Sequence, residues 1–205
     1  EFFHNQAGQM ESRERRGEFY MEFRNSDRFE ANYENTFELL LKPFNVATGV
    51  TIPVGGYDVS RLHLEYQFGQ QRPVSGTLAV EQGVFYSGRR TSVSYTNGRV
   101  KLSPQVSVEP GVQVNRVTTS FGDFTAKLLS TRATFTVTPL MFLSGLLQYN
   151  SSNNSFGTNV RFRWEYQPGS EFFVVYNDGR DTSGPGAPVL QNRSLVFKIN
   201  RLFRF

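Results

Sequence analysis

The stretch R-F-E-A-N-Y-E-N-T-F-E-L-L, residues 28–40, is the best starting point for predicting the fold. Phe29, Ala31 and Tyr33 share one parity, whereas Glu30 and Glu34 share the other. Successive side chains of a β-strand point to opposite faces, so this period of two predicts a strand with one apolar and one acidic face. At about 3.3 Å per residue the stretch would be roughly 43 Å long, well beyond an average strand.

The same alternation recurs along most of the chain. Leu62 and Leu64 lie opposite Arg61 and His63, and residues 159–167 alternate aromatic with charged side chains. No stretch shows a sustained helical period of 3.6 with caps. The sequence therefore predicts an all-β fold of about twelve antiparallel strands in up-and-down order. The expected strands are residues 2–10, 18–24, 28–40, 57–69, 74–86, 89–98, 105–117, 123–137, 141–150, 157–167, 170–178 and 193–205.

Strand length indicates what surrounds the apolar face. A soluble sandwich or lipocalin-like barrel would bury that face, but average strands have only about five or six residues. A strand as long as residues 28–40, tilted by about 40°, rises some 33 Å and can cross an apolar band of about 25 Å. Many charges on the opposite parity suit a shared lumen better than a solvent face. The pattern favours an antiparallel up-and-down transmembrane β-barrel, with the soluble fold as the alternative.

The barrel interpretation gives the polar and aromatic side chains distinct places. Mixed charges on the polar parity are expected to face the lumen and to pair there. This predicted network comprises Glu30, Glu34, Arg61, His63, Glu65, Arg161, Arg163 and Glu165. Aromatic residues near strand ends are expected to lie at the membrane interfaces, with a sugar-stacking platform as the alternative. They are Tyr57, Tyr66, Tyr86, Tyr149, Trp164, Tyr166 and Tyr176.

Connections of two lengths set the expected orientation. Short turns are predicted at residues 70–73, 138–139 and 167–170, and long loops at 44–56, 151–156 and 180–191. If the last strand ends in the periplasm, counting back places the short turns there and the long loops outside the cell. Short and long connections are then expected at opposite ends without exception.

The last residues carry a second indication of location. Lys198, Phe203 and Phe205 resemble the C-terminal recognition signal of bacterial outer-membrane barrels, although Asn200 stands where that signal has glycine. The resemblance implies a place in the bacterial outer membrane and recognition by the barrel assembly machinery. Phe205 is expected at the periplasmic interface.

Several stretches are similar to one family of large bacterial outer-membrane proteins. They are I-P-V-G-G-Y at 52–57, L-Q-Y-N-S-S at 147–152, N-V-R-F-R-W-E-Y-Q-P-G-S at 159–170 and F-V-V-Y-N at 173–177. They resemble the C-terminal barrel of proteins whose N-terminal part carries a carbohydrate-binding family 9-like domain. The resemblance implies that residues 1–205 form a barrel at the end of a longer protein. An open alternative is that they form only the later strands of a larger barrel. The resemblance implies no activity.

The sequence offers little catalytic chemistry. It contains no cysteine, which excludes disulfides, zinc–thiolate sites and cysteine nucleophiles. His63 is interpreted as a lumen residue paired with Glu or Gln rather than as the base of a hydrolase. Asp178 and Asp181 have too few neighbouring carboxylates for a calcium loop. No catalytic, cofactor-binding or metal-binding residue is therefore predicted.

Charge also argues against nucleic acid. The net charge is +4, and residues 193–205 account for all of it, while elsewhere basic and acidic residues alternate. A nucleic-acid-binding protein gathers its basic residues on one face. The expected partners are outer-membrane lipid, lipopolysaccharide and the barrel assembly machinery, with other envelope proteins or glycans also considered.

Three functions compete at this point. The first is a non-catalytic membrane anchor or assembly component. The second is a narrow porin-like pore or transporter for small solutes or glycans. The third is a barrel hydrolase acting on envelope lipid or polymer.

Overall fold

The computed structural model of the chain describes residues 2–4, 10–186 and 188–203. These residues form strands and turns, and none of their segments is a helix long and apolar enough to span a membrane. The strands are β1 (Phe2–His4), β2 (Met10–Glu22), β3 (Arg28–Leu40), β4 (Phe44–Ala47), β5 (Val50–Ile52), β6 (Gly55–Phe68), β7 (Val74–Phe85), β8 (Gly88–Lys101), β9 (Val106–Thr119), β10 (Gly122–Thr138), β11 (Met141–Asn150), β12 (Ser155–Gln167), β13 (Ser170–Asp181) and β14 (Val189–Ile199).

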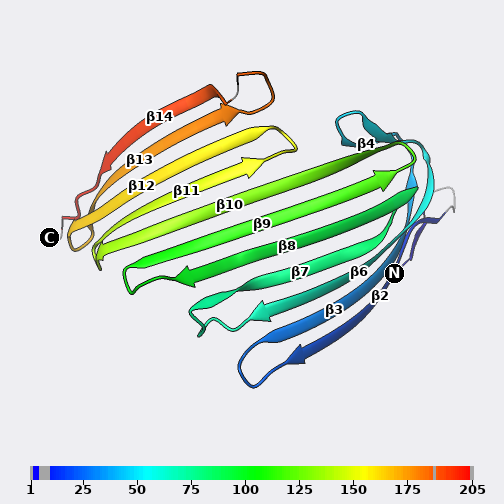
Figure 1. Ribbon diagram of the computed structural model, residues 1–205, viewed down its shortest axis with the longest axis horizontal. Helices are drawn as coiled ribbons and strands as arrows, with labels where there is room; N and C mark the ends of the chain where they lie inside the picture. Colours follow the sequence, from blue (N-terminus) through cyan, green and yellow to red (C-terminus); the bar gives the residue numbers. More distant parts are fainter. Residues whose placement is uncertain (1, 5–9, 187, 204–205) are drawn as a thin grey trace. The chain divides into compact units, whose positions relative to one another are not determined.

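The strands pair in the order in which they occur along the chain (Figure 1). Twelve of them form one sheet with the order β1-β2-β3-β6-β7-β8-β9-β10-β11-β12-β13-β14, and β4 pairs with β5 separately. The all-β, antiparallel up-and-down fold is thereby confirmed. The order has β1 at one end and β14 at the other, and no ladder of the described residues pairs the two. Closure into a barrel stays a prediction.

One expectation about the connections is refined and another is wrong. The segment 44–56, predicted to be a long loop, contains the β4–β5 hairpin. In addition, the connections β7–β8 and β9–β10, residues 86–87 and 120–121, are short although they lie at the end assigned to long loops. Two-residue hairpins need only a tight turn, and Tyr86 at a φ of 51° supplies one of them. Short connections therefore occur at both ends of the strands.

The N-terminal strands also differ from the expected ones. A single strand over 2–10 was predicted, but β1 covers only Phe2–His4, and β2 already begins at Met10. Residues 5–9 lie outside the described part of the chain. Five of the six residues at 11–16 are charged, and they obscure the alternation at the beginning of β2.

The chain divides into two compact units. Unit 1 comprises Glu1–Gln70, Gly76–Tyr95 and Gln113–Ala126, and unit 2 comprises Gln71–Ser75, Thr96–Val112 and Lys127–Phe205. Each unit is described separately below.

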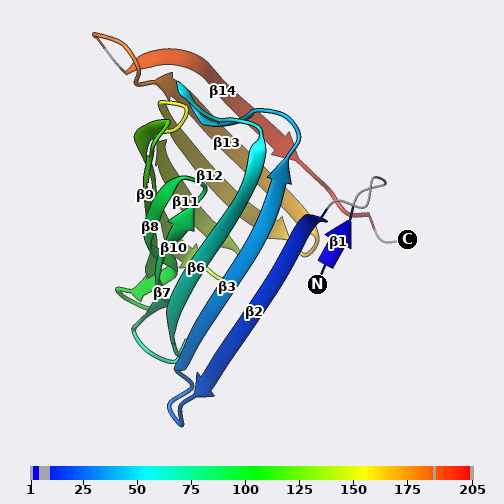
Figure 2. The ribbon, with the colours of Figure 1, turned by 90° about the vertical axis from the view of Figure 1, so that its right-hand side faces the viewer.

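In unit 1, strand β7 covers its polar parity and exposes its apolar one. On β7, Thr77 and Ala79 are 6% and 7% exposed, whereas the alternating Leu78 and Val80 are 44% and 41% exposed. Figure 2 shows β2, β3 and β6 side by side, and their register aligns the two faces of each strand. A water-soluble sheet shows the opposite preference, because burying apolar surface is what stabilises it.

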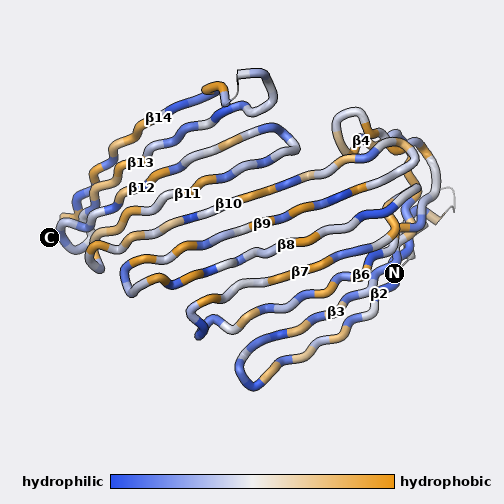
Figure 3. The backbone as a smooth tube through the Cα atoms, in the orientation of Figure 1, coloured by the Kyte–Doolittle hydropathy of each residue, from blue (hydrophilic) through white to orange (hydrophobic). Residues whose placement is uncertain are grey.

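Unit 2 has the same two-faced construction. The alternation is visible along the strands in Figure 3. Register places five apolar side chains opposite one another across β10 to β14, namely Phe135, Leu143, Phe162, Val174 and Phe197. The neighbouring row on the other face consists of Thr134, Ser144, Arg161, Val175 and Val196. Leu143 and Phe197 remain 42% and 63% exposed.

The buried apolar residues of unit 1 gather near the β4–β5 hairpin. Ile52 is 0% exposed, and Val50 and Val117 are also buried. A Cβ on Gly122, whose φ is +137°, would lie 2.9 Å from Val50, so the hairpin packs closely on the β9–β10 turn. The hairpin therefore supplies two of the five buried apolar side chains that the structure describes, Val50 and Ile52.

Asp27 fastens the turn between β2 and β3. Its buried carboxylate accepts hydrogen bonds from the Gly69 amide and the Tyr66 hydroxyl, both at 2.8 Å. A buried carboxylate is stable only when it is well hydrogen-bonded, so these contacts fix two turns of unit 1 together.

Candidate functional site

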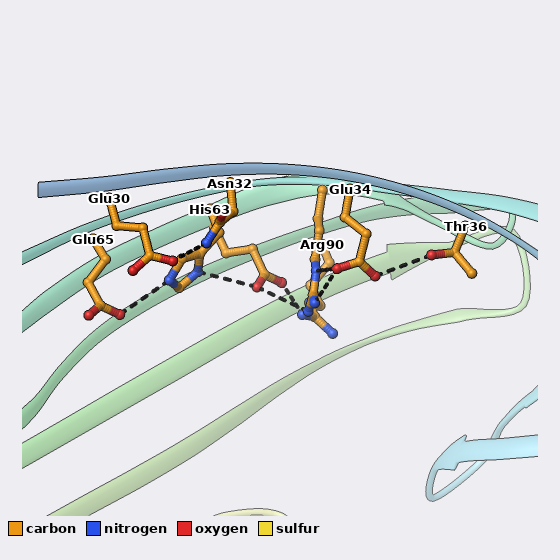
Figure 4. A network of polar contacts seen from close by, with 9 residues as sticks. Glu30, Asn32, Glu34, Thr36, His63, Glu65 and Arg90 are labelled. Carbon is orange, nitrogen blue, oxygen red and sulfur yellow. Dashed lines mark hydrogen bonds and ion pairs between the residues drawn. The ribbon is translucent and has the colours of Figure 1, made fainter. Parts of the chain in front are cut away.

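The predicted charges of unit 1 lie on one face of β3 and β6. Register sets Glu34 opposite Arg61 and Asn32 opposite His63, and His63 is in turn opposite Glu81 of β7. Directly opposed side chains on one face of a sheet are close enough to interact. The side chains labelled in Figure 4 project from the same side of their strands.

Glu81 connects the basic groups of this face. Its Oε2 lies 3.8 Å from Arg61 Nη1 and 3.6 Å from His63 Nδ1, and its Oε1 accepts a hydrogen bond from Arg90. The side chain is only 13% exposed. A carboxylate with so little access to water needs cationic partners, and it has three groups that can serve.

The pair Glu34–Arg61 is the best-formed predicted contact. Glu34 Oε2 accepts hydrogen bonds from Arg61 Nη2 at 2.6 Å and from Nε at 3.2 Å, and Thr36 donates to Glu34 Oε1. Charge-assisted hydrogen bonds of this kind are roughly twice as strong as neutral ones. We refer to Glu30, Asn32, Glu34, Thr36, Arg61, His63, Glu65, Glu81 and Arg90 as the charged face.

His63 is placed between two carboxylates. Its Nε2 lies 3.4 Å from Glu65 Oε2, and its Nδ1 faces Glu81. In a Ser–His dyad one ring nitrogen takes the proton of the nucleophile. With a carboxylate facing each nitrogen, this histidine is better arranged for charge pairing than for proton abstraction.

Sequence reasoning missed Glu81 and Arg90. Both lie in strands whose alternation of apolar and polar residues is weaker than that of residues 28–40. Glu81 has the parity opposite to Leu78 and Val80, which was the available signal. Its role as the central carboxylate became apparent only from the register with β6.

A small cavity lies beside this network. It measures about 140 Å³ and is lined by residues of β3, β6, β7 and β8 that include Glu34, Arg61, Glu81, Phe85 and Arg90. Within the described part of the chain, no cluster of three His, Cys, Asp or Glu side chains is arranged to hold a metal ion. The charged face thus presents paired charges of both signs to a small polar space.

The predicted lumen residues of unit 2 form a separate group. Arg163 donates hydrogen bonds to Glu171 and lies 4.0 Å from Glu165. Arg161 shares the face of Arg163, but among the described residues no carboxylate lies within ion-pair distance of it. The structure therefore places five of the eight predicted residues in the unit 1 face and brings two of the other three together.

Tyr57 and Tyr86 are not placed as interface residues on the apolar face. Tyr57 shares a face with Arg61, and its ring packs on that of Tyr86 at a centroid distance of 5.2 Å. The Tyr86 hydroxyl, in the β7–β8 turn, donates a hydrogen bond to Glu38 at 2.9 Å. The pKa of Tyr86 is raised to about 12. Burial is the largest cause, and the hydrogen bond to Glu38 is the second.

The other predicted interface aromatics do lie on apolar faces. Register sets Tyr66 opposite Phe29 and Leu78 in unit 1. In unit 2, Tyr149, Trp164 and Tyr176 each lie opposite apolar partners. Tyr166 follows a register shift in β12, and its hydroxyl donates to the Asn200 carbonyl.

The C-terminal segment is fastened to the β12–β13 turn. Lys198 lies opposite Phe173 near the end of β14, and the Leu202 amide donates to the buried Ser170 hydroxyl at 3.0 Å. Phe203 is exposed, and the Arg201 guanidinium lies 5.0 Å from its ring centroid. Phe205, the last residue of the predicted assembly signal, lies outside the described residues.

Comparison with known proteins adds no further assignment. No family model matches the chain, no curated protein is significantly similar to it in sequence, and no solved structure matches it.

Proposed function

We propose that this chain is a transmembrane β-barrel region of the bacterial outer membrane that serves as a membrane anchor or assembly component, without catalysis. In this proposal the apolar faces contact lipid and the charged face borders the barrel interior. The observation that carries the proposal is the reversed burial of β7, where Leu78 and Val80 are exposed and Thr77 and Ala79 are buried.

Physical chemistry supports this choice over a soluble sheet. Exposed apolar side chains recur on one face of β6, β7, β11 and β14, including Leu62, Leu64, Leu147 and Ile199. Soluble monomers rarely expose large contiguous apolar patches, and lipid is the surrounding that makes such a face favourable. The opposite face holds carboxylates and guanidinium groups in pairs, as the wall of a narrow polar interior would.

A substitution on the apolar face tests the proposal. Val80→Arg places a charge at an exposed position in the middle of β7. In lipid this should lower the free energy of unfolding by about 2–4 kcal/mol, whereas on a soluble surface it should change it by about 0.5 kcal/mol or less. Urea unfolding of the full chain in phosphatidylcholine vesicles measures the difference.

Gln82→Arg is the matched control, because Gln82 lies on the same face of β7, two residues closer to the strand end. It should cost less than Val80→Arg, because the position is nearer the strand end and already carries a polar side chain. If Val80→Arg is as harmless as Gln82→Arg, the apolar face does not contact lipid and the proposal fails.

A narrow pore is the second candidate, favoured by the partly exposed charges of the charged face. The Arg61 side chain is 46% exposed next to Glu34 and Glu81. Planar-bilayer recording distinguishes the two functions: an anchor gives no conductance steps. A pore gives steps whose ion selectivity changes with Glu81→Gln.

A further inference from the structure

A charged cluster lies at one end of the apolar face of unit 2. On this face β13 presents Phe172, Val174 and Tyr176 opposite Ile199, Phe197 and Leu195 of β14. The next opposed pair on the same face is Asp178 and Arg193, followed on β13 by Arg180. The apolar face of β13 and β14 therefore ends in two arginines and one aspartate.

Asp178 holds both arginines in place. Arg180 Nε donates to Asp178 Oδ1 at 2.6 Å, and Arg193 Nη2 donates to Asp178 Oδ2 at 2.9 Å. The Asp178 side chain is 6% exposed, whereas those of Arg180 and Arg193 are 34% and 50% exposed. The carboxylate is thus covered, and the guanidinium groups present the remaining N–H donors outward with a net charge of +1.

A shallow concavity adjoins this cluster. It measures about 320 Å³ and is lined by Phe156, Thr158, Tyr176, Asp178, Arg180 and Pro188. Arginine binds phosphate oxygens with two parallel N–H groups, and a buried partner that fixes its orientation reduces the entropy lost on binding. Tyr176 and Phe156 provide aromatic surface of the kind found at lipid–water boundaries.

In unit 1, considered separately, basic residues also follow apolar ones on the same face of a strand. On the apolar face of β2, Met21 and Phe19 are followed toward the N-terminal end by Arg15 and Arg13. Arg89 and Arg116 line a concavity of about 580 Å³ with Thr91 and Thr118. Arg13 is paired with Asp58, but Arg15, Arg89 and Arg116 have no described carboxylate within ion-pair distance. Basic residues at the edge of an apolar face thus occur in both units.

We propose that Arg180 and Arg193 bind a phosphate group of an anionic glycolipid in the outer leaflet of the membrane. This inference rests on the proposed function, which makes the apolar face lipid-facing and places the loop between β13 and β14 outside the cell. The cluster then lies at the level of lipid headgroups. There the phosphates of the lipid supply the negative charge that the outward donors lack.

Titration of the full chain with diphosphoryl lipid A in dodecyl maltoside micelles tests the proposal. Arg193→Gln leaves the Asp178–Arg180 pair intact and removes one set of outward donors, so lipid A binding should weaken about tenfold. Arg193→Lys keeps the charge but loses the paired donors, so its affinity for lipid A should lie between those of the wild type and Arg193→Gln. Arg132→Gln, on the opposite face of unit 2, is the matched control and should bind as the wild type does.

Two ligand controls identify the source of the phosphate. Dephosphorylated lipid A should bind both the wild type and Arg193→Gln weakly and equally, and inorganic phosphate at the same concentration should not displace lipid A. Equal affinity of wild type and Arg193→Gln for lipid A overturns the proposal. Displacement by inorganic phosphate overturns the assignment to a lipid.

Insertion into neutral phosphatidylcholine vesicles separates this inference from the proposed function. A chain that inserts and resists protease, but binds lipid A independently of Arg193, retains its membrane function and lacks the phosphate site. A chain that does not insert into the vesicles contradicts both the proposed membrane function and the phosphate site.

Discussion

At the scale of single residues, Glu81 is the carboxylate on which the charged face depends. It contacts Arg61, His63 and Arg90, and its side chain is only 13% exposed. We predict that Glu81→Gln lowers the free energy of unfolding by about 2 kcal/mol, because two guanidinium groups lose the negative charge that they share and keep only one amide oxygen as acceptor. Urea unfolding followed by circular dichroism measures the change.

Glu18→Gln provides the comparison for Glu81→Gln. Glu18 pairs with Arg16 of the same strand, and both side chains are more than half exposed. Exposed ion pairs contribute about 0–1 kcal/mol, so this variant should unfold nearly as the wild type does. Equal losses for the two variants would mean that the charged face behaves as an ordinary solvated surface.

Gly83 permits the close approach of β6 and β7. A Cβ at this position would stand 1.8 Å from the Ser60 carbonyl oxygen, a distance that backbone movement must relieve. We predict that Gly83→Ala destabilises the chain by about 3 kcal/mol or more, since the ladder beside Arg61 must separate.

The control for Gly83→Ala is Gly145→Ala in β11, where an added Cβ meets nothing within 4 Å. Removing glycine from a strand interior without a clash should be neutral or stabilising by about 0.5 kcal/mol. Thermal unfolding of both variants gives the comparison. A Gly83→Ala variant as stable as Gly145→Ala would show that the two strands separate at little cost.

At the scale of elements, the β4–β5 hairpin is the clearest departure from the sequence prediction. Its Gly, Pro and Thr content is typical of a loop, yet Val50 and Ile52 are buried and alternate with the exposed Thr51. Three or four residues per strand are too few for the period of two to be detected reliably. The apolar packing that stabilises the hairpin is visible only in three dimensions.

The hairpin should contribute measurably to the stability of unit 1. Ile52→Ala deletes the most completely buried apolar side chain and should cost about 2–5 kcal/mol. Val54→Ala, at a 56% exposed position just after β5, should cost much less. Urea unfolding of both variants in neutral bilayers provides the test, and similar costs would contradict packing of the hairpin on the β9–β10 turn.

At the scale of the whole molecule, the up-and-down order fixes which connections share an end. The β13–β14 loop and the β10–β11 turn lie at opposite ends of their strands, because three strands separate them. In the proposed orientation, Ser183→Cys should react with an impermeant thiol reagent on intact cells, and Leu140→Cys should not. The chain has no native cysteine to interfere.

Permeabilised cells provide the control for labelling. Both cysteines should react once the reagent enters the periplasm, because Leu140 is 53% exposed. Labelling of Leu140→Cys alone on intact cells would reverse the orientation, and with it the leaflet assigned to Arg180 and Arg193.

The class of fold and the two faces of most strands could be derived from the amino-acid sequence alone. A strand of ten or more residues with strict alternation leaves little choice, since a register change of one residue would exchange every side chain between the faces. Residues 28–40 were accordingly predicted with the bounds that β3 has. Glu34 and Arg61 could each be assigned to the polar face of its own strand. The sequence did not indicate that they pair with each other.

Which of these residues meet could be seen only in the folded chain. Register between strands depends on turn lengths and close backbone approaches, such as that at Gly83, and no single strand encodes them. Register made Glu81 the partner of three basic groups and left Arg161 without a described carboxylate partner. It also joined Asp178 to Arg193, fifteen residues further along the chain. Alternation is a local property and can be derived from the sequence, whereas pairing between strands requires the folded chain.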